Sequence, residues 1–267
     1  LDAGVDRQAG VLAVGGGVPG DLAGFAAATL RRGVRFVQVP TSLLAMVDSS
    51  VGGKTGFDRP QGKNLVGAFH QPEHVLIDVE TLSTLPDEEM SAGLAEVLKA
   101  AWLASEGAVA QLERDAAGLR AKEPAAVERA IRMAVQLKAD VVAEDEREAG
   151  RRMVLNLGHT LGHAIEAASG YSMRHGEAVG LGLLAAFRVA AALGDAEGRA
   201  HERRCEALLR AFGLPTQLDR YLDERTFAFL GTDKKRAAGQ LRFIVPGRPG
   251  RVERVPLPPA RVRALLA

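Results

Sequence analysis

The sequence has little cysteine, no excess of charge of one sign and no long apolar run. The single cysteine, Cys205, excludes an internal disulfide framework and predicts a reducing compartment, most simply the cytoplasm. Because 34 Lys and Arg face 33 Asp and Glu, the formal charge is +1, which argues against a general affinity for nucleic acid or for an anionic membrane. No uninterrupted apolar stretch is long enough to cross a bilayer, so we expect a soluble protein with no membrane partner.

The order of apolar stretches predicts two regions of different architecture. At 267 residues the chain suits one large domain or two ordinary ones. Between residues 10 and 80, apolar runs alternate with one helical stretch, which is typical of an α/β fold whose parallel strands are buried on both faces. After residue 85, apolar residues recur at helical spacing, and "LRFIVPGRPGRVERV" near the end predicts a small hairpin. We therefore expect an α/β domain over 1–85 and a mostly helical domain over 86–267. The chain begins at Leu1 without Met, so we expect an N-terminal segment to be missing.

A glycine-rich turn follows the first expected strand. Residues 15–20, "GGGVPG", match G-x-G-x-x-G between a strand and a helix, as the dinucleotide fingerprint requires. Small residues there let the backbone approach a pyrophosphate, and the helix N-terminus offers free N–H groups. The usual acidic ribose partner is missing, since the next strand ends at Thr41 and Ser42. A plain tight turn is the alternative, and a nucleotide would be bound in a modified way.

The polar stretch 47–69 reads as a glycine-rich loop that contains Lys54 and Lys63. Gly53-Lys54-Thr55 resembles the end of a phosphate loop, but Asp48 occupies the position of the first glycine in that motif, which excludes an NTPase. Two lysines among flexible backbone N–H groups still suit an anionic ligand. The alternative is a solvated surface loop.

Two histidines four residues apart interrupt a stretch that otherwise resembles a buried helix. In "LNLGHTLGHAIE", His159 and His163 lie on one helical face and could converge on one metal ion. Thr160 occupies the place of the Glu in H-E-x-x-H, so the metalloprotease template fails. Ordinary core or cap histidines are the alternative.

A carboxylate and a third histidine make a metal site plausible. Glu96 lies three residues before Lys99 on an apolar helical face, where the alternative is a structural ion pair. His175 opens another apolar helix. Together Glu96, His159 and His175 would form a set of two histidines and one carboxylate with an open position, the pattern of a catalytic zinc. His163 would then be left for proton transfer or for orienting a ligand.

The motifs in their order resemble the 3-dehydroquinate synthase family of the shikimate pathway. They are "GGGVPGDLAGFAAATLRRGVRFVQVPTSLLAMVDSSVGGKTG", "GKNLVGAFHQP", "TLSTLP", "AGLAEVLK", "LNLGHTLGHAIE" and "HGEAV". The resemblance runs from about residue 5 to the "DKK" motif at 233–235 and somewhat beyond. It departs from the family at Pro19, where a small aliphatic residue is commoner, and in the family's N-terminal strands, which this sequence does not contain.

The resemblance implies a Rossmann-like NAD domain followed by a helical metal domain, with the active site between them. The implied reaction converts 3-deoxy-D-arabino-heptulosonate 7-phosphate to 3-dehydroquinate and phosphate, with catalytic NAD and Zn²⁺ or Co²⁺. A homodimer is also implied, with Arg32 reaching a neighbour's phosphate site. Another sugar phosphate cyclase and an NAD- and metal-dependent polyol dehydrogenase are alternative enzymes. A non-catalytic binding domain is an alternative from a different class, and loss of the metal ligands would be its signature.

The resemblance also assigns roles to individual residues by motif match. It implies that Glu96, His159 and His175 bind the metal. The implied NAD contacts are Gly16, Gly17, Val18, Pro19, Gly20, Asp21, Thr41, Ser42, Lys54, Lys63, Thr81, Leu82, Ser83 and Thr84. The implied catalytic and substrate-binding residues are Arg32, Asp48, Lys54, Asn64, Lys99, Lys138, Arg152, Asn156, His163 and one lysine of "DKK", for which we choose Lys235.

Overall fold

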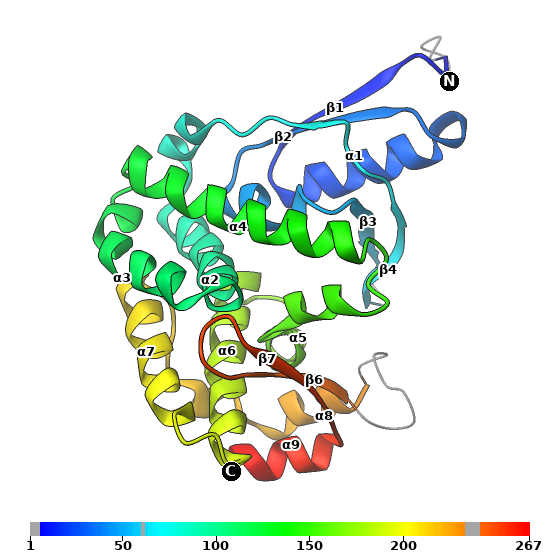
Figure 1. Ribbon diagram of the computed structural model, residues 1–267. Coiled ribbons are helices and arrows are strands. Elements are labelled where there is room, and N and C mark those ends of the chain that lie inside the picture. The colour runs from blue at the N-terminus through cyan, green and yellow to red at the C-terminus, as the bar shows by residue number, and fades with distance from the viewer. Residues whose placement is uncertain (1–5, 60–61, 233–240) are drawn as a thin grey trace.

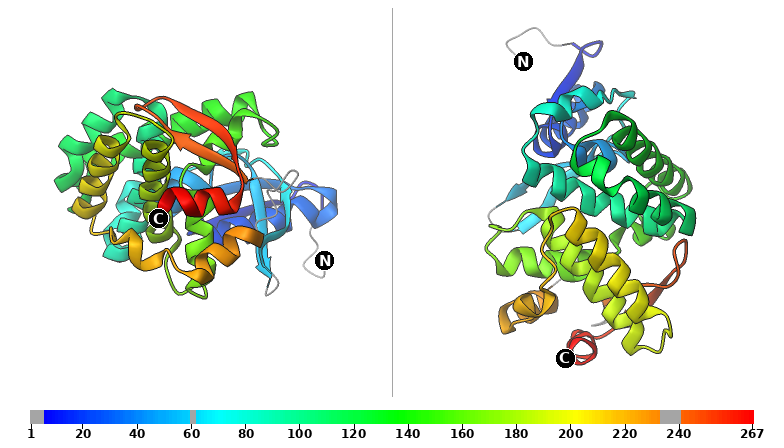
Figure 2. Two further views of the ribbon diagram at one scale, coloured as in Figure 1. Left: turned by 90° about the horizontal axis from the view of Figure 1, so that it is seen from below. Right: turned by 90° about the vertical axis from the view of Figure 1, so that its left-hand side faces the viewer.

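The computed structural model describes residues 6–59, 62–232 and 241–267 (Figure 1). The α/β region lies at the top of Figure 1, the helices lie below it, and α4 crosses between the two. The right-hand view of Figure 2 shows β1 (blue) and α9 (red) at opposite ends of the molecule. In the described part of the chain, no helix is both long enough and apolar enough to span a membrane.

The α/β region is built on a small parallel sheet. Strands β1 (Gly10–Gly15) and β2 (Arg35–Pro40) pair in register from Gly10 opposite Arg35, and β5 (His74–Val75) extends the sheet in the order β1-β2-β5. Helix α1 (Gly17–Thr29) joins β1 to β2 and packs against both. The predicted α/β class is therefore confirmed.

One expectation for this sheet was wrong, because β1 is not buried on both faces. Leu12 and Val14 are 63% and 60% exposed, while Ala13 between them is buried. The side chains of a strand alternate between faces, and α1 covers only the face that carries Ala13. The predicted strand at 73–80 is also short. Asp78 accepts a hydrogen bond from the Glu80 N–H and starts the 3₁₀ turn Val79–Thr84 instead.

The predicted loop at 47–69 was wrong as well. Its first part belongs to a π-helical turn, Ala45–Ser49, and β3 (Lys54–Arg59) pairs with β4 (Gly62–Phe69) in an antiparallel hairpin. Gly56 and Gly67 face each other in this hairpin, and a Cβ added to either would lie 2.4 Å from a carbonyl oxygen of the other strand. These glycines permit close approach of two backbones rather than a flexible loop. Lys54 and Lys63 therefore stand on strands.

The helical region surrounds a long buried helix, α6 (His175–Ala192). It packs against α2, α5 and α7, and the Phe187 ring meets the Trp102 ring edge-on at 4.5 Å between centroids. The predicted terminal hairpin is confirmed as β6 (Leu241–Pro246) and β7 (Val252–Leu257). Helices of this region are α2 (Asp87–Ala104), α3 (Glu106–Arg120), α4 (Pro124–Glu144), α5 (His159–Ala168), α7 (Gly198–Ala211), α8 (Glu224–Thr232) and α9 (Pro259–Leu266), with 3₁₀ turns at Arg151–Asn156 and Leu218–Tyr221. A further 3₁₀ turn, Leu30–Arg32, follows α1 in the α/β region.

The main hydrophobic core is shared across the expected domain boundary. Leu43, Met46 and Leu82 precede residue 85, yet they pack into the same buried cluster as the helices. A separate, smaller cluster lies between α1 and the sheet. We propose the division near residue 85 because α2, which begins at Asp87, starts the helical region.

Candidate active site

Two buried charges of opposite sign lie on α2. Glu96 is 2% exposed and Lys99 is 3% exposed, and Lys99 Nζ lies 2.5 Å from Glu96 Oε2, as expected for an i,i+3 pair. Even so, within the described ranges neither carboxylate oxygen of Glu96 has a hydrogen bond of good geometry. Because a buried carboxylate is costly unless its oxygens are satisfied, Glu96 is suited to accept a further cation.

His159 presents one defined nitrogen to Glu96. His159 is the first residue of α5. Its Nδ1 lies 3.1 Å from the Leu157 carbonyl oxygen, which can only accept a hydrogen bond. In the neutral ring, the hydrogen is therefore on Nδ1 and the lone pair is on Nε2. That Nε2 lies 3.5 Å from Glu96 Oε1.

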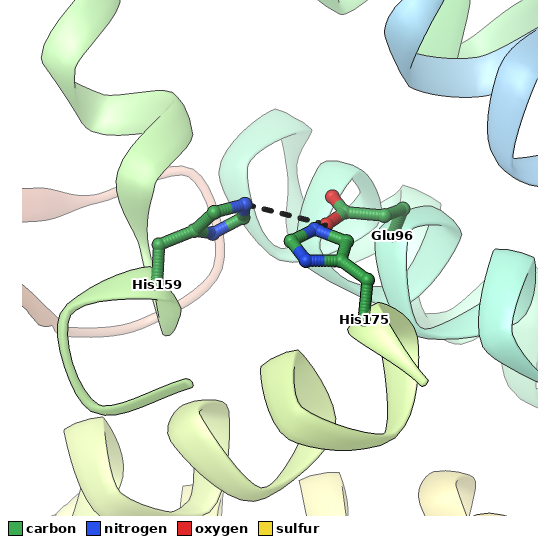
Figure 3. Close-up of side chains that lie close together, drawn as sticks. All are labelled: Glu96, His159 and His175. Carbon is green, nitrogen blue, oxygen red and sulfur yellow. Dashed lines mark ion pairs between the residues drawn. The ribbon is translucent and has the colours of Figure 1, made fainter. Parts of the chain in front are cut away.

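His175 reaches the same carboxylate from a third helix. Its Nε2 lies 3.4 Å from Glu96 Oε1. Gly176 makes this approach possible, because a Cβ added there would lie 2.0 Å from the Ala92 carbonyl oxygen of α2. Figure 3 shows the two rings, from α5 and α6, turned toward the Glu96 carboxylate.

The three side chains offer a donor set that fits a divalent cation. Ligand atoms of Glu96, His159 and His175 all lie within 4.8 Å of one another. Two imidazoles and a carboxylate, with room for a further ligand, are typical of catalytic zinc. In this structure the Glu96 oxygens without hydrogen bonds and the Nε2 lone pair of His159 are available to bind such a cation.

The electrostatics of these groups also favour a cation. Burial alone would raise the pKa of Glu96, but the nearby Lys99 ammonium outweighs it and lowers that pKa to about 2. Burial, together with Lys99, holds the pKa of His159 well below its usual range, so the ring is neutral. Burial opposes a charge on His175, but the carboxylates of Glu166 and Glu96 raise its pKa to about 9. Binding of a cation at His175 must therefore release a proton.

A second pair of charges adjoins the first. Lys138, from α4, places Nζ 2.5 Å from Asp48 Oδ1 in the π-helical turn. Burial lowers the pKa of Lys138, whereas Lys138 and Lys99 hold the pKa of Asp48 far below its usual range despite burial. Two ammonium groups thus lie beside the cation site, where they can attract an anionic ligand.

Glu148 joins two residues that sequence analysis assigned to substrate. Its carboxylate forms an ion pair with Lys54 of β3 and accepts a hydrogen bond from Asn156 Nδ2. Glu148 has a φ of 59°, an unusual backbone conformation for a residue other than glycine. Acidic oxygens therefore lie at a place where the substrate's anionic groups were expected.

Arg152 is more deeply buried than a residue that simply faces a ligand. It is 2% exposed, and its Nη2 donates to the Gly52 carbonyl oxygen at 2.8 Å. Nη1 donates to the carbonyl oxygen of Glu146, while Nε has no hydrogen bond among the residues described. The guanidinium therefore connects the turn before β3 to the 145–150 segment.

The start of α1 offers unused donors. Its N-cap, Gly16, has no side-chain capping hydrogen bond in the described structure, so the first N–H groups of the helix are open to an anion. The buried Ser49 hydroxyl lacks a hydrogen-bond partner among described residues, and a Cβ on Gly17 would lie 3.1 Å from it. These features fit the phosphates of a dinucleotide. Burial, together with Asp48, raises the pKa of Asp21 in the next turn to about 7.

Other expected nucleotide contacts are more scattered. Thr41 donates its N–H to the Gly15 carbonyl oxygen, and Ser42 Oγ accepts from the Ala45 N–H, so both lie beside the glycine turn. Ser83 and Thr84 are exposed, whereas the Leu82 side chain is 1% exposed in the core. Contact of Leu82 with a cofactor would therefore have to use its backbone.

Several predicted site residues either lie far from this cluster or fall outside the described residues. Arg32 is exposed and follows the far end of the 13-residue α1, about 20 Å from the glycine turn at 1.5 Å per residue. The side chains of Lys63 and Asn64, and all of Lys235, lie outside the described residues. Sequence reasoning missed Ser49, Glu148 and Glu166. Of these, only Glu166 had a local signal, because it follows His163 by three residues.

Comparisons with solved structures define the class of protein. ValA, a 2-epi-5-epi-valiolone synthase from Streptomyces hygroscopicus subsp. jinggangensis solved with NAD⁺ and Zn²⁺, superposes with a TM-score of 0.87 at 30% identity, over 99% of this chain and 74% of that one. A 2-deoxy-scyllo-inosose synthase, complexed with carbaglucose-6-phosphate, NAD⁺ and Co²⁺, gives 0.87 at 26% identity, over 99% and 75%. The fold is thus that of these two synthases.

The family follows from the sequence matches. Models of the 3-dehydroquinate synthase N-terminal and C-terminal regions match residues 1–92 and 93–236. A 3-dehydroquinate synthase from Symbiobacterium thermophilum is 50% identical over 249 residues, which cover 93% of this chain and 70% of the relative. The chain belongs to the 3-dehydroquinate synthase family.

Proposed function

We propose that the protein is a 3-dehydroquinate synthase, a lyase-type cyclase of aromatic amino acid biosynthesis. It converts 3-deoxy-D-arabino-heptulosonate 7-phosphate to 3-dehydroquinate and phosphate. The observation that carries this function is the buried set of Glu96, His159 and His175 beside Lys99, in a chain with about half of its residues identical to a 3-dehydroquinate synthase. NAD and zinc or cobalt are the cofactors that the related cyclases support.

The chain's own groups would divide the work. Glu96, His159 and His175 would hold the divalent cation, and the start of α1 with Ser49 would bind the NAD phosphates. When bound, NAD supplies reversible hydride transfer and the cation supplies Lewis acidity at the reacting hydroxyl. Lys99 and Lys138 would neutralise the substrate's anionic groups in a site largely closed to water. His163 would move a proton near the substrate, and the 5.2 Å between its ring centroid and that of His159 supports this role.

The remaining assignments keep their predicted roles. We propose Asp48, Lys54, Asn64, Arg152, Asn156 and Lys235 as substrate contacts. We also propose a homodimer, because Arg32 is exposed and the family resemblance assigns it to a neighbour's phosphate site. Light scattering at assay concentration checks the assembly, and a fully active monomer would contradict it. The cytoplasmic location stays a prediction, which rests on the single cysteine.

The test is release of phosphate from the heptulosonate phosphate with NAD in catalytic amount. We expect phosphate and 3-dehydroquinate in equal amounts, no accumulation of NADH and loss of turnover with a chelator. Stoichiometric conversion of NAD to NADH would instead identify a polyol dehydrogenase. Faster turnover of a heptulose phosphate without a carboxylate would identify another sugar phosphate cyclase.

A further inference from the structure

Glu166 is a buried carboxylate on the helix that carries two of the histidines. Residues 159, 163 and 166 are spaced i, i+4 and i+7, so they share one face of α5. The Glu166 side chain is 4% exposed. Carboxylates are seldom buried so fully without a counter-charge or a metal nearby. The proposed function gives this residue no role.

The position of Glu166 relative to His175 is specific. Glu166 Oε2 lies 3.6 Å from His175 Nδ1, while Nε2 of the same ring lies 3.4 Å from Glu96 Oε1. The ring therefore lies between carboxylates of α5 and α2, and each nitrogen faces one of them. With the Nδ1 hydrogen directed to Glu166, the lone pair of the neutral ring is on Nε2, facing Glu96 and His159.

The other histidine of the set is oriented in a different way. His159 Nδ1 faces the neutral carbonyl oxygen of Leu157 at 3.1 Å, whereas His175 Nδ1 faces a charged acceptor. Metal-binding imidazoles usually donate their second N–H to such acceptors, which fixes the tautomer and raises the basicity of the ring. A carboxylate does this more strongly than a carbonyl group.

Direct coordination by Glu166 is the competing arrangement. Ligand atoms of His163, Glu166 and His175 also lie within 4.8 Å of one another. However, Nδ1 and Nε2 point to different sides of the imidazole ring. A cation bound at Nε2, between Glu96 and His159, leaves Glu166 beyond the ring.

We propose that Glu166 is a positioning residue that holds His175 through Nδ1, so that Nε2 points at the cation site. This inference rests on the proposed function, since it requires a divalent cation at Glu96, His159 and His175. Removal of the acceptor then weakens cation binding without removing a ligand. Losses of 10- to 100-fold are typical for such partners.

The test measures cation binding as well as activity. Glu166→Gln keeps the size and an acceptor oxygen but removes the charge, and Glu166→Ala removes the acceptor. Glu202→Gln is the control, because Glu202 is also a largely buried carboxylate but pairs with Arg188 and Arg199, not with the histidines. Competition between Co²⁺ and a chelator gives the affinity, the Co²⁺ d–d spectrum gives the geometry, and thermal melting checks that each variant folds.

We expect Co²⁺ binding about 10- to 100-fold weaker in Glu166→Ala, a smaller loss in Glu166→Gln, altered d–d bands in both and no change in Glu202→Gln. Variants that bind Co²⁺ within twofold of the parent would overturn the inference. If the parent forms 3-dehydroquinate and both variants bind Co²⁺ as tightly as the parent does, only the role of Glu166 is refuted. A parent that binds neither Co²⁺ nor Zn²⁺ refutes the proposed function as well.

A measurement on the unmodified protein keeps the test independent of any substitution. Nitrogen NMR of the Zn²⁺-loaded parent should show His175 with hydrogen on Nδ1 and metal on Nε2. The reverse tautomer would overturn the inference. A Glu166 oxygen at about 2.0–2.2 Å from the ion in a crystal structure would do the same.

Discussion

The two regions of the molecule surround their polar groups with different amounts of apolar material. The sheet side has a small separate cluster of Ala13, Ala27, Val34 and Phe36, and Leu12 beside it is 63% exposed. The helical region places Glu96 and Lys99 within a large core, on a helix that also carries the fully buried Trp102. Removing one partner of a charge pair costs more free energy of unfolding when the pair is buried in an apolar core. The energetic cost of substitution should therefore fall from the helical site toward the sheet and the junction.

The largest effect is expected at the cation site. His159→Ala should abolish phosphate release and stoichiometric zinc binding, because it removes one of three donors that face a single point. Zinc content after dialysis and turnover are the two measurements. His163→Ala is the matched control on the same helix, and it should keep its zinc while turnover falls. A His159→Ala protein with zinc and full activity would contradict the proposed ligand set.

Glu96 tests whether burial in the helical core sets the cost. Glu96→Ala leaves Lys99 buried without its 2.5 Å partner, so we expect a loss of about 3–5 kcal/mol in the free energy of unfolding. Urea unfolding of the metal-free protein measures it. Glu128→Ala on the exposed face of α4, which breaks an ion pair of i,i+4 spacing, should cost less than about 1 kcal/mol. Equal losses of stability in Glu96→Ala and Glu128→Ala would show that burial in the helical core does not set the cost.

Arg152 tests the junction between the regions. Arg152→Ala removes donors to the Gly52 and Glu146 carbonyl oxygens, and we expect a loss of about a hundredfold in kcat/KM. The neighbouring Arg151 pairs with Glu144 and its side chain is 56% exposed, so Arg151→Ala should change kcat/KM less than about twofold. Steady-state kinetics with zinc and NAD saturating makes the comparison. Similar effects of the two substitutions would refute a special role for Arg152.

Asp21 gives the sheet side a dependence on pH. Burial raises its pKa from 3.8 to about 7, so the folded protein holds this proton more tightly than the unfolded chain does. The contribution of the protonated Asp21 to the free energy of unfolding is fully present below pH 3.8 and is lost as the pH rises through about 7. Asp21→Asn should therefore lose less stability than the parent between pH 5 and 8, by on the order of 1–3 kcal/mol. Thermal melts at both pH values measure the difference, and the exposed Glu73→Gln should behave as the parent does.

Local spacing predicted the helical part of the site well. Glu96 and Lys99 pair because i,i+3 residues share a helical face, and His159 and His163 converge because i,i+4 residues do. Contacts between distant segments could not be predicted in this way. The pairing of Glu148 with Lys54 joins residues 94 positions apart, and no periodicity encodes it.

The sheet side was harder to predict for a related reason. Glycine is common both in loops and where two backbones approach closely, so Gly56 and Gly67 were interpreted as loop residues. They belong to a hairpin whose pairing depends on the whole segment. Burial of β1 was inferred from its apolar run alone, although α1 covers only one of its faces. Metal ligands from three helices could be proposed from residue chemistry, but only the packing of α6 on α2 at Gly176 brings His175 to Glu96.

The smallest effect is expected at Glu148, where the two regions meet through a partly exposed ion pair. The side chains of Lys54 and Glu148 are 50% and 21% exposed, so their pairing is worth at most about 1 kcal/mol. Glu148→Gln removes a negative charge from Lys54 and Asn156, which a substrate anion would otherwise have to displace. We therefore expect the apparent KM for the heptulosonate phosphate to fall by about two- to fivefold, since 1 kcal/mol corresponds to about fivefold in affinity. The nearby exposed Glu144→Gln should leave KM unchanged. A higher KM in Glu148→Gln would mean that Glu148 orients Lys54 for the substrate rather than competing with it, and the junction would then belong with the rigid helical site.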